Sequence, residues 1–124
     1  MSKVLLVDDS MFTRSMLKKL VKEMGHEVVE AVNGREGLDA ITREEPDIVI
    51  TDLLMPEVDG IGLLEGVKEK NIDVPVAVLS ANVQDSVREQ CIKLGAAEFF
   101  NKPPNKEKLK KYIEESLVKG DITP

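Results

Sequence analysis

Short strand-like runs, largely apolar and with Glu30 and Glu98 as their only charged residues, alternate with segments of helical periodicity along the whole chain. Five runs have the length of buried strands: Val4–Val7, Val28–Ala31, Ile48–Thr51, Val74–Leu79 and Ala97–Phe100. Each run is followed by a stretch whose apolar residues recur every three or four positions, which is typical of amphipathic helices. This alternation predicts an α/β domain with five parallel strands and five helices.

Turn and breaker residues separate these segments. The first helix is predicted from about Ser10 to Met24, and it ends at Gly25 because glycine favours the turn that closes a helix. Glycine and proline mark the remaining boundaries, at Asn33-Gly34, Pro46, Pro56, Asp59-Gly60, Gly95 and Lys102-Pro103-Pro104. Ile48–Thr51 is apolar without alternation, which predicts a central strand covered on both faces. We expect one domain over residues 1–119 and a short tail over residues 120–124.

Length, charge and cysteine content limit the range of possible functions. A chain of 124 residues with a net charge of −6 allows one core and argues against nucleic acid or an anionic membrane as the main partner. The only cysteine, Cys91, is predicted on the buried face of a helix, and a single cysteine favours a reducing cytoplasm. The only histidine, His26, is interpreted as an ordinary surface residue in a loop. The apolar runs are far shorter than the roughly 20 residues of a membrane span, so we expect a soluble cytoplasmic protein.

Three acidic residues stand where predicted strands end. Asp8 and Asp9 close the first strand, and Asp52 closes the third. Because the carboxyl ends of neighbouring parallel strands meet at one edge of the sheet, the three carboxylates are expected to converge there. Like charges so close together either raise a carboxyl pKa or hold a cation. Ligands that offer only oxygen suit a hard ion, of which Mg²⁺ fits best.

These residues and three further motifs follow the order of a known family. The motifs are Asp52-x-x-Met55-Pro56-x-x-Asp59-Gly60, Ser80 after the fourth strand and Lys102-Pro103 after the fifth. Over nearly its whole length the chain resembles the receiver domain of two-component response regulators. Its length is similar to that of the single-domain chemotaxis regulators of the CheY type. The resemblance implies a flavodoxin-like (βα)5 fold, in which a doubly wound five-stranded parallel sheet has the order 2-1-3-4-5.

The resemblance also implies a role for each site residue. Asp52 would be the phosphoryl acceptor, and Asp9 would bind Mg²⁺ directly. Asp8 would assist chiefly through bound water, and the backbone carbonyl of Leu54 would complete the protein ligands. Lys102 would pair with the acceptor carboxylate before transfer and with a phosphoryl oxygen afterwards.

Two further residues match the switch positions of the family. Ser80 would move to donate a hydrogen bond to the new phosphoryl group, and Phe99 would turn inward as Ser80 moves. A core residue of the fifth strand is the alternative interpretation of Phe99, and its lack of a hydroxyl group favours an inward position even without phosphate. Leu54 and Asn82 flank the site and are expected to influence the lifetime of the phosphoryl group. The Lys102-Pro103 bond is cis in the family, whereas sequence alone favours trans.

The sequence therefore predicts a phosphorylation-switched signalling module more than an enzyme. A sensor histidine kinase would phosphorylate Asp52, and the face made by the fourth helix, fifth strand and fifth helix would bind an output protein, in the flagellar motor or elsewhere. The chain is expected to promote its own phosphorylation from small donors and to be a monomer or weak dimer. Two alternatives are a receiver fragment of a larger regulator and a small hydrolase of phosphate esters with an Asp nucleophile. Such hydrolases usually carry a second Asp two residues after the nucleophile, where this chain has Leu54.

Overall fold

The computed structural model describes residues 2–55, 58–81 and 84–121, in which strands and helices alternate from end to end. The strands are β1 (Lys3–Val7), β2 (Glu27–Ala31), β3 (Ile48–Asp52), β4 (Val76–Ser80) and β5 (Glu98–Asn101). The helices are α1 (Met11–Glu23), α2 (Gly34–Glu44), α3 (Gly60–Glu69), α4 (Asp85–Lys93) and α5 (Lys106–Asp121). The predicted succession of strand and helix is thus confirmed.

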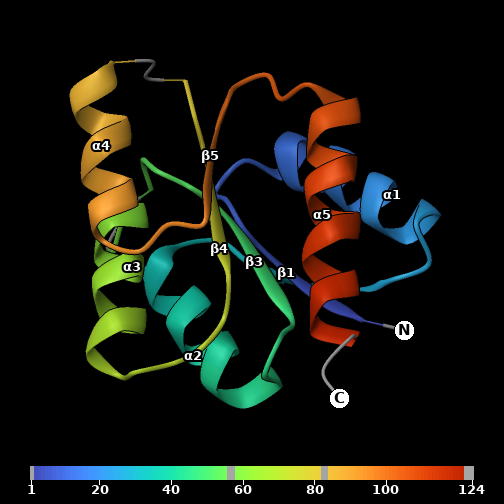
Figure 1. Cartoon of the computed structure of the whole chain (residues 1–124), viewed down its shortest axis with the longest axis horizontal. Coiled ribbons are helices and arrows are strands. Elements are labelled where there is room, and N and C mark those ends of the chain that lie inside the picture. Colours follow the sequence, from blue (N-terminus) through green and yellow to red (C-terminus); the bar gives the residue numbers. More distant parts are fainter. Residues whose placement is uncertain (1, 56–57, 82–83, 122–124) are drawn as a thin grey trace.

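The strands form one parallel sheet in the order β2-β1-β3-β4-β5. In Figure 1, α1 and α5 cover one face of this sheet, while α2, α3 and α4 cover the other. β3 lies in the middle, as its uninterrupted apolar run predicted. The carboxyl ends of the strands point to the top of Figure 1, so the loops that follow them gather at one edge. The arrangement is the flavodoxin-like fold expected from the sequence.

Successive side chains of the central strands point into two separate cores. In β1, Leu5 and Val7 pack with residues of α2, α3 and α4, whereas Val4 and Leu6 pack with residues of α1 and α5. All four side chains are buried. A parallel sheet buried on both faces needs this pattern, because each strand has to supply apolar side chains to both helical layers. The two cores hold the carboxyl edge of the sheet in place.

Polar side chains fix the start of three helices. Ser10, Asn33 and Asp59 each accept a hydrogen bond from the backbone N–H three residues later, which satisfies a donor that the first turn leaves unpaired. Asn33-Gly34, expected as a turn, is therefore the beginning of α2: Asn33 caps the helix and Gly34 is its first residue.

Two helices end just before the glycines that predicted their ends. Gly25 and Gly95, with φ angles of +87° and +102°, come two residues after the last residue of α1 and α4, as predicted. Glycine adopts this left-handed conformation at little cost. α5 continues to Asp121, which is two residues into the segment expected as a tail. The Lys102-Pro103 bond is cis, which is the isomer of the family and not the one that the sequence alone favours.

The later strands begin slightly beyond their apolar runs. β4 begins at Val76, although the apolar run begins at Val74, because the ladder with β3 starts at the pair Val49 and Val76. β5 begins at Glu98, the partner of Ala77 in β4, one residue later than predicted. Strand ends are thus set by the neighbouring strand as well as by local hydrophobicity.

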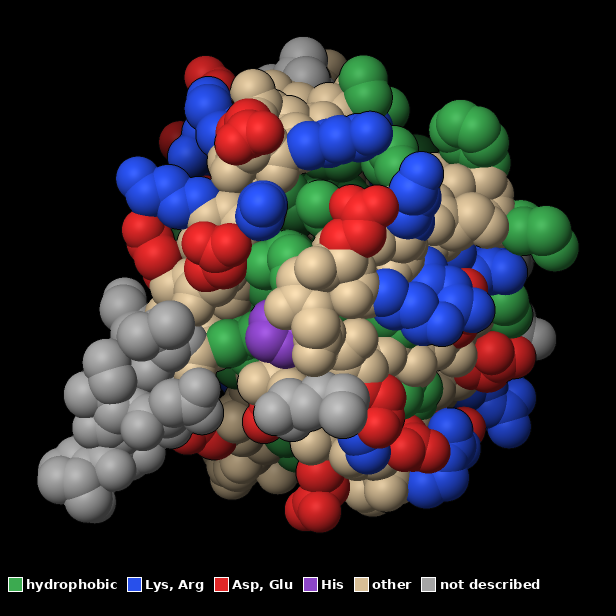
Figure 2. All heavy atoms as spheres, turned by 90° about the vertical axis from the view of Figure 1, so that its right-hand side faces the viewer, with side chains coloured by type: hydrophobic (Ala, Val, Ile, Leu, Met, Phe, Trp, Pro, Cys, Tyr) green, Lys and Arg blue, Asp and Glu red, His purple; other side chains and the backbone are tan. Residues whose placement is uncertain are grey.

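His26 differs from its interpretation as an ordinary surface residue. Its side chain is half-buried, and its Nδ1 atom is enclosed without a hydrogen-bond partner among the described residues. In Figure 2 the histidine lies among other side chains on the side of the molecule that carries α1 and α5, where acidic and basic groups are interspersed. Cys91 is buried on α4, as predicted.

Some expectations fall on residues outside those described: Pro56, Asn82 and the last residues of the tail, 122–124. No helix within the described part of the chain is long and apolar enough to cross a membrane.

Candidate functional site

The three predicted carboxylates meet at the carboxyl edge of the sheet. β1 and β3 are neighbours and pair Val7 with Thr51, so Asp8 and Asp52 follow directly on adjacent strands. Asp8, Asp9 and Asp52 each present one carboxylate oxygen, and these oxygens all lie within 4.8 Å of one another. An all-oxygen set this tight fits a hard divalent cation such as Mg²⁺.

Lys102 joins two of these carboxylates. Its Nζ atom lies 2.9 Å from Oδ2 of Asp8 and 3.1 Å from Oδ2 of Asp52. The backbone places it there, because the Lys102 N–H donates to the carbonyl of Ser80 at the end of β4 (2.9 Å). One ammonium group thus reaches across the sheet to the acidic cluster. It offsets part of the repulsion between Asp8 and Asp52.

Asp8 is fixed by contacts to each of its acceptor groups. Its Oδ1 accepts from the N–H of Ser10 (2.8 Å) and its Oδ2 from Lys102, while its carbonyl accepts from Nη1 of Arg14 (2.6 Å). Only 1% of Asp8 is exposed, whereas the neighbouring Asp9 is exposed. The two adjacent carboxylates therefore differ: Asp8 is held by protein donors, and Asp9 faces solvent at the rim of the cluster.

Burial and the ion pair between them shift the pKa values of Asp52 and Lys102. The pKa of the Asp52 carboxyl is raised, chiefly because burial penalises its charge, with a further contribution from the neighbouring Asp8; Lys102 and the Leu53 N–H oppose the rise without cancelling it. Burial pushes the pKa of Lys102 downward, but its hydrogen bonds to Asp8 and Asp52 outweigh burial and the net shift is upward. Lys102 therefore stays protonated at neutral pH, and it is shared between two carboxylates.

The remaining predicted residues lie on the strands beside this cluster. Asp52 pairs with Leu79 in the ladder between β3 and β4, so Ser80 stands one residue beyond that pair, buried at the end of β4. Phe99 on β5 pairs with Val78 and is only 8% exposed. The Leu54 side chain, two residues after Asp52, is 72% exposed. The role of the Leu54 carbonyl as a ligand stays a prediction.

Two contacts that could not be predicted from the sequence, made by Gly60 and Arg14, shape the site. Gly60 packs against the backbone of Asp52, where a β-carbon would lie 2.6 Å from the Asp52 carbonyl oxygen. Arg14 contacts the Asp8 carbonyl from α1. The Asp59-Gly60 dipeptide could be recognised in the sequence as a turn, but the contact of Gly60 with the Asp52 backbone could not. Arg14 carried a weaker signal, since a basic residue near the N-terminus of a helix opposes the helix dipole and so needs a compensating partner.

Comparison with known proteins gives one consistent result. The model of the response regulator receiver domain family matches residues 4–114. The chemotaxis protein CheY of Listeria monocytogenes is 38% identical over 117 residues, which cover 94% of this chain and 98% of that protein. A protein-glutamate methylesterase/protein-glutamine glutaminase of Treponema denticola is 38% identical over 109 residues, which cover 85% of this chain and 29% of that protein. The chain thus spans less than a third of the second relative's length.

Solved structures agree in fold. The receiver domain of a Francisella response regulator superposes with a TM-score of 0.92 at 28% identity and covers 97% of this chain and 99% of its own. The chemotaxis protein CheY4 of Vibrio cholerae has a TM-score of 0.86 at 30% identity and covers 94% of this chain and 98% of its own.

Proposed function

The chain belongs to the response regulator receiver domain family, and on that premise we propose that it is a phosphorylation switch whose acceptor is Asp52. The observation that carries the proposal is the position of Lys102, whose ammonium group lies 3.1 Å from Asp52 within a cluster of three carboxylates. An ion pair that served stability alone would not need a third carboxylate beside Lys102, Asp8 and Asp52, because the excess negative charge is costly. A phosphoryl group, which carries negative charge of its own, needs such a cation beside the nucleophile.

This geometry supports transfer of a phosphoryl group from a phosphohistidine. An oxygen of the Asp52 carboxylate forms a bond to phosphorus as the P–N bond to the donor imidazole breaks, and the bonding electron pair leaves with the imidazole. Lys102, protonated at neutral pH, can exchange its contact with Asp52 for a phosphoryl oxygen while Asp8 still holds it. The Leu53 N–H, 2.7 Å from Oδ1 of Asp52, fixes the orientation of the carboxylate during the attack.

Asp8, Asp9 and Asp52 fit Mg²⁺, since their three oxygens lie close together and offer no soft ligand. We assign direct binding to Asp9 and Asp52, together with the Leu54 carbonyl, and assign to Asp8 contact through water. When bound, Mg²⁺ would offset negative charge on the carboxylates and on the incoming phosphoryl group. Asp8 suits the indirect role because both of its carboxylate oxygens already accept hydrogen bonds from protein donors.

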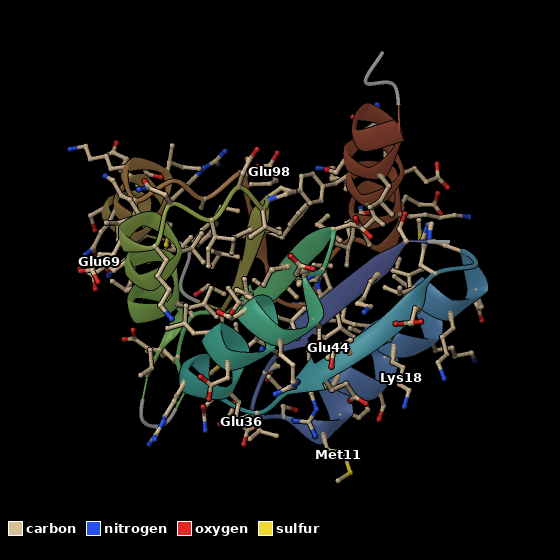
Figure 3. All side chains as sticks on the ribbon, turned by 90° about the horizontal axis from the view of Figure 1, so that it is seen from below. Met11, Lys18, Glu36, Glu44, Glu69 and Glu98 are labelled. Atoms are coloured by element: carbon tan, nitrogen blue, oxygen red, sulfur yellow. The ribbon has the colours of Figure 1, made fainter. Side chains whose placement is uncertain are left out.

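The donor is a histidine kinase, and it has to cover the rim of the cluster to bring its histidine to Asp52. Large apolar side chains stand at this rim: Met11 and Phe12 are 73% and 81% exposed at the start of α1, and Leu54 follows Asp52. Figure 3 shows Met11 extending away from the body of the molecule. Exposed apolar groups beside an acidic cluster suit contact with a protein donor, because burying them adds affinity where the charge alone would repel.

The output partner binds the face made by α4, β5 and α5. This face contains a surface hollow of about 590 Å³ whose lining includes Arg88 from α4, Phe100 from β5, and Lys108 and Tyr112 from α5. Phe100 and Tyr112 form an edge-to-face pair with ring centroids 5.6 Å apart. Aromatic rings flanked by basic side chains are common anchors for a partner segment. The CheY relatives are chemotaxis proteins, and we propose control of chemotaxis in the cytoplasm as the pathway.

Intact mass spectrometry after incubation with acetyl phosphate and Mg²⁺ tests the proposal. We expect a mass gain of one phosphoryl group that disappears in Asp52→Asn and persists in Asp39→Asn, a control at an exposed aspartate of α2. Multiple-turnover hydrolysis of small phosphate esters without a phosphorylated protein would instead support the hydrolase alternative. A mass gain that survives in Asp52→Asn would show that Asp52 is not the acceptor.

A further inference from the structure

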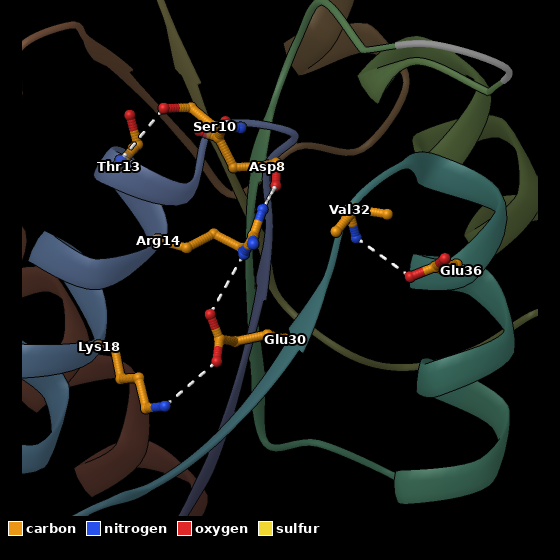
Figure 4. A network of polar contacts seen from close by, with 8 residues as sticks. All are labelled: Asp8, Ser10, Thr13, Arg14, Lys18, Glu30, Val32 and Glu36. Carbon is orange, nitrogen blue, oxygen red and sulfur yellow. Dashed lines mark hydrogen bonds and ion pairs between the residues drawn. The ribbon is translucent and has the colours of Figure 1, made fainter.

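Arg14 on α1 makes two charged or polar contacts on opposite sides of its guanidinium group. Nη1 donates to the backbone carbonyl of Asp8 at 2.6 Å, and Nε donates to Oε1 of Glu30 at 3.2 Å. Glu30, on β2, also binds Lys18 through its other carboxylate oxygen at 3.3 Å. Figure 4 shows this line of contacts, which runs from Asp8 at the carboxyl end of β1 through Arg14 to Glu30 and Lys18. The Arg14 side chain is only 12% exposed.

The ion pair with Glu30 favours a guanidinium group here, but two other electrostatic effects oppose it. Arg14 lies near the N-terminus of α1, where the helix dipole already favours negative charge. It also adds positive charge beside a cluster that we propose to bind a cation, and like charge weakens cation binding. The benefit of Arg14 is therefore to be sought in geometry, since its planar fork can hold two acceptors in fixed directions.

The carbonyl that Arg14 holds belongs to the peptide between Asp8 and Asp9. The Asp8 carboxylate is fixed independently, by Ser10 and Lys102. The Asp9 carboxylate makes no hydrogen bond or ion pair within residues 2–55, 58–81 and 84–121, so its direction depends on its backbone. A peptide is planar, and fixing its carbonyl fixes the N–H and α-carbon of the next residue.

From these contacts we infer that Arg14, anchored by Glu30, is a positioning residue that orients Asp9 toward the cation. The inference rests on the proposed function, because it assigns Arg14 to the same Mg²⁺ site. Arg14 touches neither the cation nor the phosphoryl group in this role. It acts through the Asp8–Asp9 peptide, much as residues beyond the ligand shell orient ligands in other metal sites.

Mg²⁺ titration of the unphosphorylated protein, followed by NMR at the Asp9 amide, separates geometry from charge. Positioning predicts that Arg14→Gln weakens Mg²⁺ binding on the order of tenfold. Charge alone predicts the opposite sign, because the variant removes a positive group near a cation site. Lys18→Gln is the matched control: it removes the same charge from the same network without touching Asp8, and we expect its Mg²⁺ affinity to be unchanged or slightly higher. Arg14→Lys keeps the charge but loses the fork, and it should also bind more weakly than the wild type.

Each outcome decides the matter. Mg²⁺ binding in Arg14→Gln that equals or exceeds the wild type would overturn the role of Arg14 while leaving the proposed function intact. If Arg14→Gln fails to fold, Arg14→Lys carries the test, and wild-type affinity in that variant would overturn the inference. A wild-type protein that binds no Mg²⁺ would overturn the metal site itself, and with it this role.

Discussion

The α-carbon of Gly60 faces the carbonyl of Asp52 so closely that a methyl group on it would stand 2.6 Å from the carbonyl oxygen. The same methyl group would lie 2.9 Å from the α-carbon of Leu53. Both neighbours are backbone atoms at the end of β3, where the proposed phosphoryl acceptor lies, so neither can rotate away. The first residue of α3 and the acceptor strand are thus fitted to each other, and the Gly60 N–H donates to the Leu53 carbonyl at 2.8 Å.

Gly60→Ala should therefore lower the free energy of unfolding by about 1–3 kcal/mol, the usual cost of forcing extra volume into a packed site. The displaced strand end should also slow phosphorylation of Asp52. Gly62→Ala is the control in the same helix. Its methyl group would meet a side-chain methyl of Val58 at 2.7 Å, which can turn aside, and alanine gains helix propensity of about 1 kcal/mol over glycine. Urea denaturation that ranks the two variants equally would contradict this account of Gly60.

Asp52→Asn should make the metal-free protein more stable at pH 7 than the wild type. Burial raises the pKa of Asp52 in the folded state, so between the unfolded value of about 3.9 and the folded value the native protein binds more protons than the unfolded chain. Stability of the wild type therefore falls as pH rises through that window, and above it the full cost of the buried charge remains. Asparagine carries no charge and avoids this cost.

Melting temperatures measured in EDTA between pH 4 and pH 8 test the effect. The difference in melting temperature between Asp52→Asn and the wild type should be smallest near pH 4 and should increase toward pH 8. Asp39→Asn, at an exposed position, should show no such trend. A variant that is less stable than the wild type at pH 7 would show that the ion pair with Lys102 outweighs burial.

The convergence of Asp8 and Asp52 could be predicted because it follows from two apolar runs and the geometry of parallel strands. Each run fixed a strand, and the residue after each run had to lie at the carboxyl edge. The sequence predicted which residues meet, but not how they are held. Lys102 was expected near Asp52 by resemblance, whereas its second contact with Asp8 depends on a backbone hydrogen bond to Ser80 that no local pattern records.

Contacts between distant segments account for the other differences. Arg14 on α1 donates a hydrogen bond to Glu30 on β2, which lies 16 residues further along the chain. Gly60 packs against Asp52 because the loop after β3 brings the start of α3 back to the end of that strand. His26 was interpreted from its place after a helix-ending glycine, but how far its side chain is covered depends on what packs over that loop. Asn33 was read as half of a turn, although a cap and a turn share the same residue preference. Local sequence patterns thus predicted the helices and strands, whereas the contacts of individual side chains depend on tertiary structure.

Phe99→Ala should lower the free energy of unfolding of the unphosphorylated protein by about 3–5 kcal/mol, which is typical of removing a buried ring. The Phe99 ring is packed in the core formed with α2, α3 and α4, a position that fits a core residue of β5 as well as the inward position expected of the proposed switch. Phe12→Ala removes the same group from an 81% exposed position and should change stability by less than about 0.5 kcal/mol. Equal effects of the two variants would mean that Phe99 spends most of its time outside the core.

Ser80→Ala should still accept a phosphoryl group at Asp52 but should transmit less of its effect to α4, β5 and α5. Ser80 is buried at the end of β4, one residue past the partner of Asp52, and it pairs with Asn101 of β5 on its other side. It therefore lies between the proposed acceptor, Asp52, and the proposed output face. A hydroxyl group that turns toward the new phosphoryl group vacates space beside β5, and a two-state element of this kind is what couples a charge change to a distant surface.

Backbone NMR spectra with acetyl phosphate and Mg²⁺ measure this transmission. In the wild type, phosphorylation should change chemical shifts from Asp85 to Tyr112. In Ser80→Ala these changes should shrink although mass spectrometry still shows phosphorylation, and Ser86→Ala, at an exposed serine of α4, should resemble the wild type. A partner that prefers the phosphorylated state tenfold needs a shift of only about 1.4 kcal/mol, which the hydrogen bonds of one hydroxyl group can supply. If the shift changes concentrate on Phe12 to Leu20 instead, the coupling runs through α1, and the output face lies on that side of the sheet.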